Sequence, residues 1–172
     1  MKERALTLGD IDALLALQQD ILRELPHKDW LAETEREQLA YMLSGGGYGL
    51  GLFDGEKLLG AWLLYYPFGR EDNLAGLIGG ERNSTAHYEL ALLDRALRGQ
   101  GLHRQMVERL TVHAARDGRF TRLAATVHPD NAASLRGFLR GGFAVADTRE
   151  MYGGVLRHIL IKPLQNCPES VQ

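Results

Sequence analysis

Hydrophobic and polar residues alternate at the start of the chain and then recur at helical spacing. Residues 2–8 alternate as they would in a half-buried strand. Thr7 and Asp10 have the spacing of a capping box, a pair of side chains that begins many helices. The apolar residues that follow share one face of a predicted helix: Ile11, Leu14, Leu15, Leu17, Ile21 and Leu22. A strand followed by an amphipathic helix is therefore predicted.

A second helix is predicted over residues 30–43, because Pro26 interrupts the first one. Glu33, Glu35 and Glu37 lie in its first turns, where the helix dipole favours acidic side chains. We expect this helix to end at the glycine run of residues 45–47.

The next segment has the pattern of a β-hairpin followed by a long connection. Residues 50–53 and 57–66 are predicted strands, and Asp54-Gly55 between them suits the positive φ of a tight turn. Residues 67–85 are rich in glycine and long for a connection inside one domain. Two interpretations of this stretch stay open, a lid or binding loop and an ordinary surface loop.

The second half of the chain alternates strands with helices. Strands are predicted over residues 87–93, 123–127, 143–149 and 155–162, and helices over residues 101–116 and from Pro129-Asp130-Asn131 to Gly141-Gly142. A crossover helix between two strands of one sheet requires them to be parallel. We therefore predict an α/β (α+β) protein with a mixed, mostly antiparallel sheet flanked by helices, one domain over residues 1–164 and a polar tail over residues 165–172.

Composition and charge narrow the functional classes. The net charge of -2 and the pI near 6.3 give no general field for nucleic acid. Cys167, the only cysteine, cannot form an intrachain disulfide, which fits a reducing cytoplasm. No signal peptide or membrane anchor is evident. No metal is expected either, because metal-binding spacing is missing from the histidines, which are His27, His87, His103, His113, His128 and His158.

The segment with the clearest chemical meaning is residues 93–103, between a predicted strand and a predicted helix. Gly99 and Gly101 let the backbone approach a phosphate, and the first N–H groups of the helix would point at it. An ordinary glycine-containing turn is the alternative interpretation. A nucleotide fold of another kind is disfavoured, because the segment lacks the P-loop ending Gly-Lys-Ser/Thr and residues 45–51 do not fit the dinucleotide pattern.

This segment resembles the donor-binding motif of the GNAT superfamily of acyl-coenzyme A-dependent N-acyltransferases, Arg/Gln-x-x-Gly-x-Gly/Ala. Arg98 and Gly101 match, while His103 stands where the family has Gly or Ala. Its backbone N–H can still donate to the diphosphate. The imidazole either lies outward in solvent, which we favour, or touches phosphate.

A second match lies at residues 127–143, in the expected order after the first. Asn131, Ala132, Ala133 and Ser134, closing in Gly142-Phe143, resemble the family's Asn-x-x-Ala/Ser helix. The resemblance implies a central pair of parallel strands that splay apart, with the pantetheine arm of the donor between them. Asn131 would face this arm, or would cap the following helix. The donor-binding residues implied are Leu93, Arg95, Arg98, Gly99, Gln100, Gly101, Leu102, His103, Asn131, Ser134 and Phe138.

Phe138 departs from the family pattern, because many members have a tyrosine here that protonates the departing thiolate. Phenylalanine has no proton to give. Ser134 and Tyr152 are the hydroxyls that could take this role, and water is the alternative. Ser134 could equally be a helix-cap partner of Asn131.

Glu89 is the candidate base, since the family often carries a glutamate in this region of the strand, and an ammonium acceptor must lose a proton before it attacks. A carboxylate is a weak base for an amine, so burial or a relaying water would be needed. In the alternative interpretation, the Glu89 carboxylate is solvated or forms an ion pair and is not the base. His87 and His128 could substitute as base, although each lone histidine is more often structural. Arg95, Arg104, Arg136 and Arg140 could neutralise phosphate or lie in solvent.

The resemblance implies transfer of an acetyl group from acetyl-coenzyme A directly to a primary amine in a ternary complex. Two alternatives stay open: a GNAT-like module that binds acyl-coenzyme A without turnover, and an unrelated phosphate-binding α/β protein. The sequence identifies neither the acceptor nor the oligomeric state, and a homodimer is left open. Aromatic residues that could line an acceptor pocket are Trp30, Tyr41, Tyr66 and Phe68.

Overall fold

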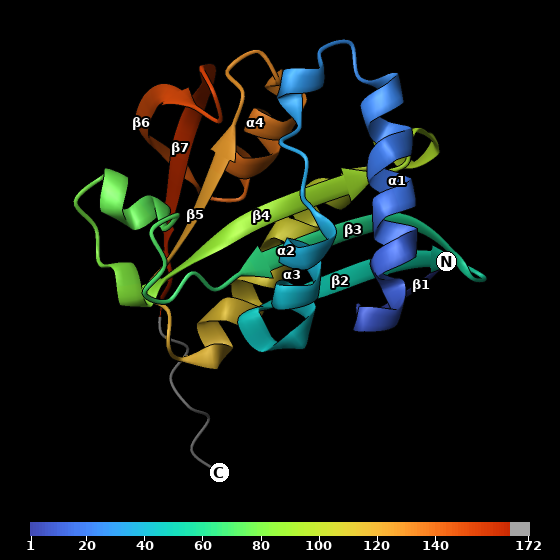
Figure 1. Cartoon of the computed structure of the whole chain (residues 1–172), viewed down its shortest axis with the longest axis horizontal. Helices are drawn as coiled ribbons and strands as arrows, with labels where there is room; N and C mark the ends of the chain where they lie inside the picture. Colours follow the sequence, from blue (N-terminus) through green and yellow to red (C-terminus); the bar gives the residue numbers. More distant parts are fainter. Residues whose placement is uncertain (166–172) are drawn as a thin grey trace.

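The computed structural model describes residues 1–165, which build a seven-stranded sheet between two layers of helices (Figure 1). The strands are β1 (Lys2–Ala5), β2 (Gly47–Asp54), β3 (Lys57–Tyr65), β4 (Thr85–Leu93), β5 (Arg122–Val127), β6 (Ala144–Met151) and β7 (Val155–Pro163). Their spatial order is β1-β2-β3-β4-β5-β7-β6. Only β4 and β5 pair in parallel within this sheet, and every other neighbouring pair is antiparallel. The predicted α/β architecture with a mostly antiparallel sheet is confirmed.

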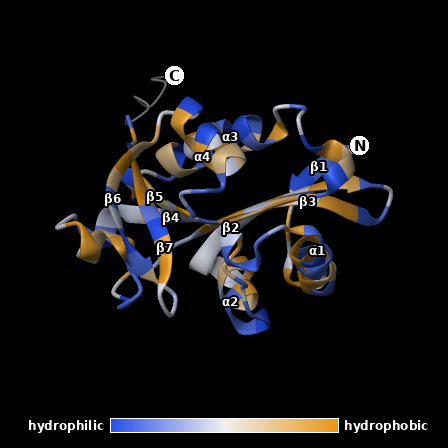
Figure 2. Ribbon diagram, turned by 90° about the horizontal axis from the view of Figure 1, so that it is seen from above, coloured by the Kyte–Doolittle hydropathy of each residue, from blue (hydrophilic) through white to orange (hydrophobic). Residues whose placement is uncertain are grey.

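The helices cover the two faces of the sheet separately (Figure 2). They are α1 (Ile11–Glu24), α2 (Arg36–Tyr41), α3 (Leu102–Asp117) and α4 (Ala132–Arg140). Apolar residues of α1 and α2 pack on one face with Leu63 and Leu90. Those of α3 and α4 pack on the other face with Trp62 and Tyr88. Trp62 and Leu63 are neighbours on β3, and successive side chains of a strand point to opposite faces, so the strand contributes residues to both cores.

The first helix begins as the sequence predicts. The Thr7 backbone N–H donates to the Asp10 carboxylate at 2.8 Å, which forms the capping box. Arg4 on β1 donates to both oxygens of the same carboxylate at 2.8 and 2.7 Å. These hydrogen bonds, that from Arg4 above all, lower the pKa of Asp10 to about 2. Strand β1 and helix α1 are thus fixed to each other by one charged group.

The second helix starts later than predicted, at Arg36 rather than at residue 30. Only a short 3₁₀ turn, Lys28–Trp30, forms in the earlier part. The Thr34 backbone is held by the side chain of Gln18 on α1, which accepts from its N–H at 3.0 Å and donates to its C=O at 3.0 Å. A buried amide therefore takes the hydrogen bonds that a longer helix would have made.

Strands β4 and β5 pair over four residues and then separate. Thr85–Tyr88 lies against Arg122–Ala125, whereas β4 continues to Leu93 and β5 to Val127 without mutual pairing. Helix α3 follows β4, and helix α4 follows β5. The implied splay of the central strands is thus present, and it opens between the starts of these two helices.

Candidate active site

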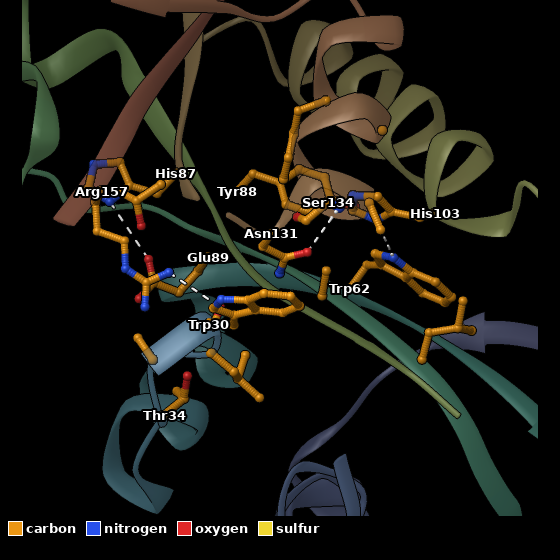
Figure 3. A pocket seen from close by; sticks show the side chains of 18 of the residues that line it. Trp30, Thr34, Trp62, His87, Tyr88, Glu89, His103, Asn131, Ser134 and Arg157 are labelled. Atoms are coloured by element: carbon orange, nitrogen blue, oxygen red, sulfur yellow. Dashed lines mark hydrogen bonds and ion pairs between the residues drawn. The ribbon is translucent and has the colours of Figure 1, made fainter. Parts of the chain in front are cut away.

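A cavity of about 1070 Å³ begins at the split between β4 and β5 and passes through the sheet (Figure 3). Its walls come from the first turns of α3 and α4, from β4 and β7, and from the segments before α2 and after β3. The volume is at the upper end of what small-molecule sites use, and is large enough for an extended cofactor with a small partner. One end lies at the glycine turn and the other at Glu89.

The glycine turn is built as a helix N-terminus with an open front. Gly99 and Gly101 have φ angles of +80° and +75°, and Gly101 is the N-cap of α3. A Cβ atom built on either glycine meets no atom within 4 Å. Gln105 makes the first bond of the helix ladder, to Gly101 O at 3.2 Å, which leaves the preceding N–H groups at the cavity. This end of the cavity suits a phosphate group.

The side chains of the turn are not all placed as expected. Leu93 and residues 98–103 line the cavity, whereas Arg95 is exposed and lies outside its wall. Asp94 accepts from the Ala96 N–H at 2.9 Å and caps a 3₁₀ turn that carries Arg95 away. Arg95 is therefore not part of the cavity wall in this structure, and its role in donor binding stays a prediction. Arg98 donates from Nε to Leu93 O at 3.1 Å, so its side chain also braces the end of β4.

His103 does not point to solvent, and the favoured prediction for its ring was wrong. Its Nδ1 accepts from Trp62 Nε1 at 3.3 Å, and the ring packs edge-on against Tyr88 and Phe138. This places the proton on Nε2, which is sealed from solvent and has no partner. Burial lowers the pKa of His103 to about 4. Only its backbone N–H remains for the phosphate, because the side chain fills the space against Gly137.

Asn131 caps helix α4 and also lines the cavity. Its Oδ1 accepts from the Ser134 backbone N–H at 3.2 Å, which caps α4. Both residues line the cavity, and the Asn131 amide nitrogen points into it (Figure 3). The cap thus fixes an amide donor toward the space between the splayed strands, with the Ser134 side chain on the same wall.

Glu89 occupies a β-bulge on β4. Leu63 pairs with Leu90 and Leu64 with Tyr88, so Glu89 is the extra residue opposite β3. The side chain is 25% exposed, and its Oε1 accepts from Gln38 Nε2 on α2 at 2.9 Å. The bulge turns a carboxylate into the cavity beside the point where β5 leaves β4.

His87 supports Glu89 rather than replacing it. Its Nε2 accepts from the Leu74 backbone N–H at 3.0 Å, so Nδ1 carries the proton and faces Glu89 Oε2 at 3.8 Å. His128 Nδ1 accepts from the Asp130 N–H at 3.1 Å, while its Nε2 lies 3.5 Å from Asp29. His128 is not among the residues that line the cavity. Neither histidine offers a free nitrogen to an amine there.

The sequence model of the "Acetyltransferase (GNAT) domain" matches residues 4–144, most of the chain. The chain belongs to the GNAT acetyltransferase family. A search of curated proteins gives no significant match.

Solved structures show the same fold at low identity. A GNAT acetyltransferase from Streptococcus pneumoniae is 18% identical, with a TM-score of 0.72 over 95% of this chain and 99% of that one. An aminoglycoside acetyltransferase in complex with coenzyme A and kanamycin is 16% identical, with a TM-score of 0.71 over 96% and 95%. The ribosomal-protein-S18-alanine N-acetyltransferase from Escherichia coli is 16% identical, with a TM-score of 0.68 over 99% and 98%.

Phe138 lies where many GNAT proteins have a tyrosine, and here it belongs to the core. It is 3% exposed and packs edge-on against Tyr88, His103 and Phe143. It is also among the residues that line the cavity. The Tyr88 hydroxyl next to it is buried without a hydrogen-bond partner, and burial raises its pKa well above 10.

The far end of the GNAT cavity is closed by segments that the sequence left undefined. Trp30 lines it, as do Asp72, Asn73 and Leu74 from the stretch after β3, whereas Tyr41, Tyr66 and Phe68 do not. That stretch is therefore part of the wall and not an ordinary surface loop. Tyr152 also lines the cavity, with its hydroxyl 3.3 Å from Thr126 Oγ1. Desolvation is the main cause that raises the pKa of this phenol.

The arginines of α3 and α4 and that of β7 differ in how far the sequence pointed to them. Arg104, Arg136 and Arg140, for which phosphate and solvent were both left open, are exposed side chains that line the cavity. Arg157 on β7 is buried in the opposite part of the wall, and the sequence did not single it out, because a lone arginine in a strand carries no signal of burial at a cavity.

No helix in residues 1–165 is long and apolar enough to cross a membrane. The same residues contain no group of three side chains suited to hold a metal ion.

Proposed function

We propose that this GNAT protein transfers an acetyl group from acetyl-coenzyme A directly to a primary amine of a small molecule. The observation that supports this best is one cavity joining a helix N-terminus, a pair of splayed strands and a carboxylate on a β-bulge. The three parts suit a diphosphate, an extended pantetheine arm and an amine, in that order. Two of the solved relatives are named N- or aminoglycoside acetyltransferases, and one of these holds coenzyme A.

The donor would bind from the glycine turn inward. The N–H groups at the start of α3 would hold the diphosphate, with residues 98–103 around it and Arg104 nearby. The pantetheine arm would bond to the unpaired edges of β4 and β5 as an added strand does, with Asn131 donating to it. The thioester would then lie beside Glu89, Ser134 and Phe138.

In the reaction, the neutral amine attacks the thioester carbonyl carbon, the C–N bond forms and the C–S bond breaks. Glu89, held by Gln38 and faced by His87, would accept the proton from the incoming ammonium directly or through water. Backbone N–H groups of β4 beyond the parallel pairing would polarise the carbonyl oxygen. The departing thiolate would take a proton from Ser134, Tyr152 or water, and the second proton that the nitrogen loses on becoming an amide would restore that group.

Thiol release from acetyl-coenzyme A with a panel of small primary amines tests this function. We expect release that depends on the amine, with initial-rate patterns of a ternary complex and no acetylated protein intermediate. Acetyl-coenzyme A binding without release with any amine would instead support a donor-binding module, a second candidate that the buried, hydroxyl-free Phe138 favours. Absence of donor binding would overturn both.

A further inference from the structure

Arg157 on β7 is a buried cation in the wall of the cavity. It is 3% exposed, and it donates to the backbone carbonyls of Asp29 and Trp30, the latter at 3.3 Å. Its Nε–H has no hydrogen-bond partner. A guanidinium has five N–H donors, so two bonds to neutral carbonyls leave most of its hydrogen-bonding capacity unused.

Arg157 also forms no direct ion pair within the described part of the chain, although the Asp29 carboxylate attracts its charge from a greater distance. Arg98 and Arg104, which line the opposite end of the cavity, are exposed and lie 3.5 Å from Glu24 and Glu108. No carboxylate lies within 4.0 Å of Arg157 in residues 1–165. Burial of a charge that has no directly paired counter-ion is costly, so a buried guanidinium with unused donors at a cavity suggests an anionic ligand.

The position of Arg157 assigns this ligand to the acceptor side. Figure 3 shows Arg157 beside Glu89 and His87, across the cavity from Asn131, Ser134 and His103. The guanidinium lies 5.5 Å from the centre of the Tyr152 ring. Charges of both Glu89 and Arg157 act on the pKa of that phenol, so both groups lie on the Tyr152 side of the cavity.

We propose that the acceptor carries a carboxylate near its amine, as a free amino acid does, and that Arg157 binds this carboxylate. The inference rests on the proposed function. Glu89 would receive the ammonium and Arg157 the carboxylate, while the Trp30 ring, which lies beside both of them in Figure 3, would cover the carbon skeleton. A carboxylate accepts from a guanidinium through two parallel hydrogen bonds, which orients the amine as well as holding it.

Acidic side chains also line this end of the cavity, and they would attract an amine with several positive charges. Their attraction for such an amine is weaker than that of Arg157 for a carboxylate. Glu33 and Glu71 are exposed, and Asp72 is half exposed and accepts from Tyr65 Oη at 2.9 Å. Solvent and salt screen such charges, whereas the charge of Arg157 acts through a buried, low-dielectric wall. The acceptor is therefore expected to be zwitterionic.

Matched acceptors test this inference in the unmodified protein. Thiol release is measured with amino acids, with their amides and with the amines that result when the carboxylate is removed. We expect kcat/KM to be about 10- to 100-fold higher for the amino acids than for either neutral counterpart, the range of a few charged hydrogen bonds. Equal values for the three compounds would overturn the inference and leave the proposed function intact.

Variants separate carboxylate binding from a purely structural role of Arg157. In Arg157→Gln the preference for amino acids should fall to about 1, and Arg157→Lys should keep part of it. Arg149 is the matched control, because it pairs with Arg157 across β6 and β7 and also donates to a backbone carbonyl, Leu77 O at 3.0 Å. Arg149→Gln should keep the wild-type preference.

A structural role predicts a different pattern. Arg157→Gln would then lower kcat/KM equally for amino acids and for neutral amines, and an unchanged ratio would overturn the inference. Donor affinity, measured by calorimetry with coenzyme A, shows whether the variant is folded. If Arg157→Gln does not fold, the kcat/KM ratio of amino acids to their neutral counterparts in the wild-type protein decides the question by itself. No turnover with any amine would overturn the proposed function and this inference with it.

Discussion

At the scale of single residues, Glu89 owes its place to a break in strand pairing. One extra residue between Tyr88 and Leu90 shifts the register with β3 and turns the carboxylate into the cavity. Gln38 then holds it by a hydrogen bond at 2.9 Å, and the His87 ring faces it at 3.8 Å. A side chain so fixed can meet an incoming ammonium without a large loss of conformational entropy.

Replacing Glu89 by Gln should lower the turnover rate about 100-fold or more, because the amide keeps the shape but cannot accept the proton. The affinity for coenzyme A should change little. The loss should shrink as the pH rises, since more of the amine then arrives deprotonated. Steady-state thiol release between neutral and alkaline pH measures this. A small loss that does not vary with pH would assign Glu89 to structure.

Phe138→Tyr should leave turnover unchanged or raise it. The added hydroxyl would extend from the wall beside the expected sulfur, and the unpaired N–H of His103 is a neighbour that could donate to it. Turnover is compared with thermal stability in the same preparation. A large loss of turnover at normal stability would show that Phe138 packs directly against the donor or the acceptor.

At the scale of elements, helix α3 has a left-handed glycine at each end, and only one of them lies at the cavity. Gly101 at its start and Gly118 at its end have φ angles of +75° and +76°. An added Cβ atom meets nothing within 4 Å at either position. The two positions therefore have equal backbone strain and equal space, and they differ in whether a donor would lie against them.

Gly101→Ala and Gly118→Ala should each lower the unfolding free energy by about 1 kcal/mol, the cost of a left-handed conformation for a residue with a Cβ. Gly101→Ala alone should weaken coenzyme A binding, by about tenfold or more, which is about 1.4 kcal/mol. Chemical denaturation and calorimetry measure the two quantities. Equal donor affinities in the two variants would mean that the diphosphate binds elsewhere.

At the scale of the whole molecule, the buried ring of His103 links stability to pH. Its pKa is about 4 in the folded protein, against 6.5 for a histidine exposed to water, because burial disfavours the charged form. A lowered folded-state pKa means that the unfolded chain binds the proton first as pH falls. The contribution to stability is complete above about pH 6.5 and is lost progressively down to about pH 4.

His103→Gln should remove this dependence, since the Gln oxygen can still accept from Trp62 Nε1. Between pH 7 and pH 4.5 the wild type should lose about 2 kcal/mol more unfolding free energy than the variant. Urea unfolding at each pH measures the difference. Other groups that titrate in this range, such as His113, are present in both proteins and cancel. Parallel curves would show that the ring is not buried in solution.

The order of elements and the glycine turn before α3 were determined by the sequence itself. Alternation, helical spacing, the capping box at Thr7 and the pair Asp54-Gly55 are local signals, and they predicted the strands and helices nearly as found. Gly101 and Asn131 could also be identified locally, because a left-handed N-cap and an Asn cap depend on backbone geometry within a few residues. The family resemblance added the splay of β4 and β5.

Only the tertiary structure decided what lies around these motifs. The Gln18 side chain on α1 shortens α2, Trp62 from β3 turns the His103 ring inward, and Arg157 from β7 reaches the segment before α2. Each of these contacts joins residues far apart in the chain, so no local pattern records it. The donor end of the site could therefore be predicted from local backbone chemistry. The acceptor end could not, because its walls come from segments that meet only when the sheet and both helix layers are assembled.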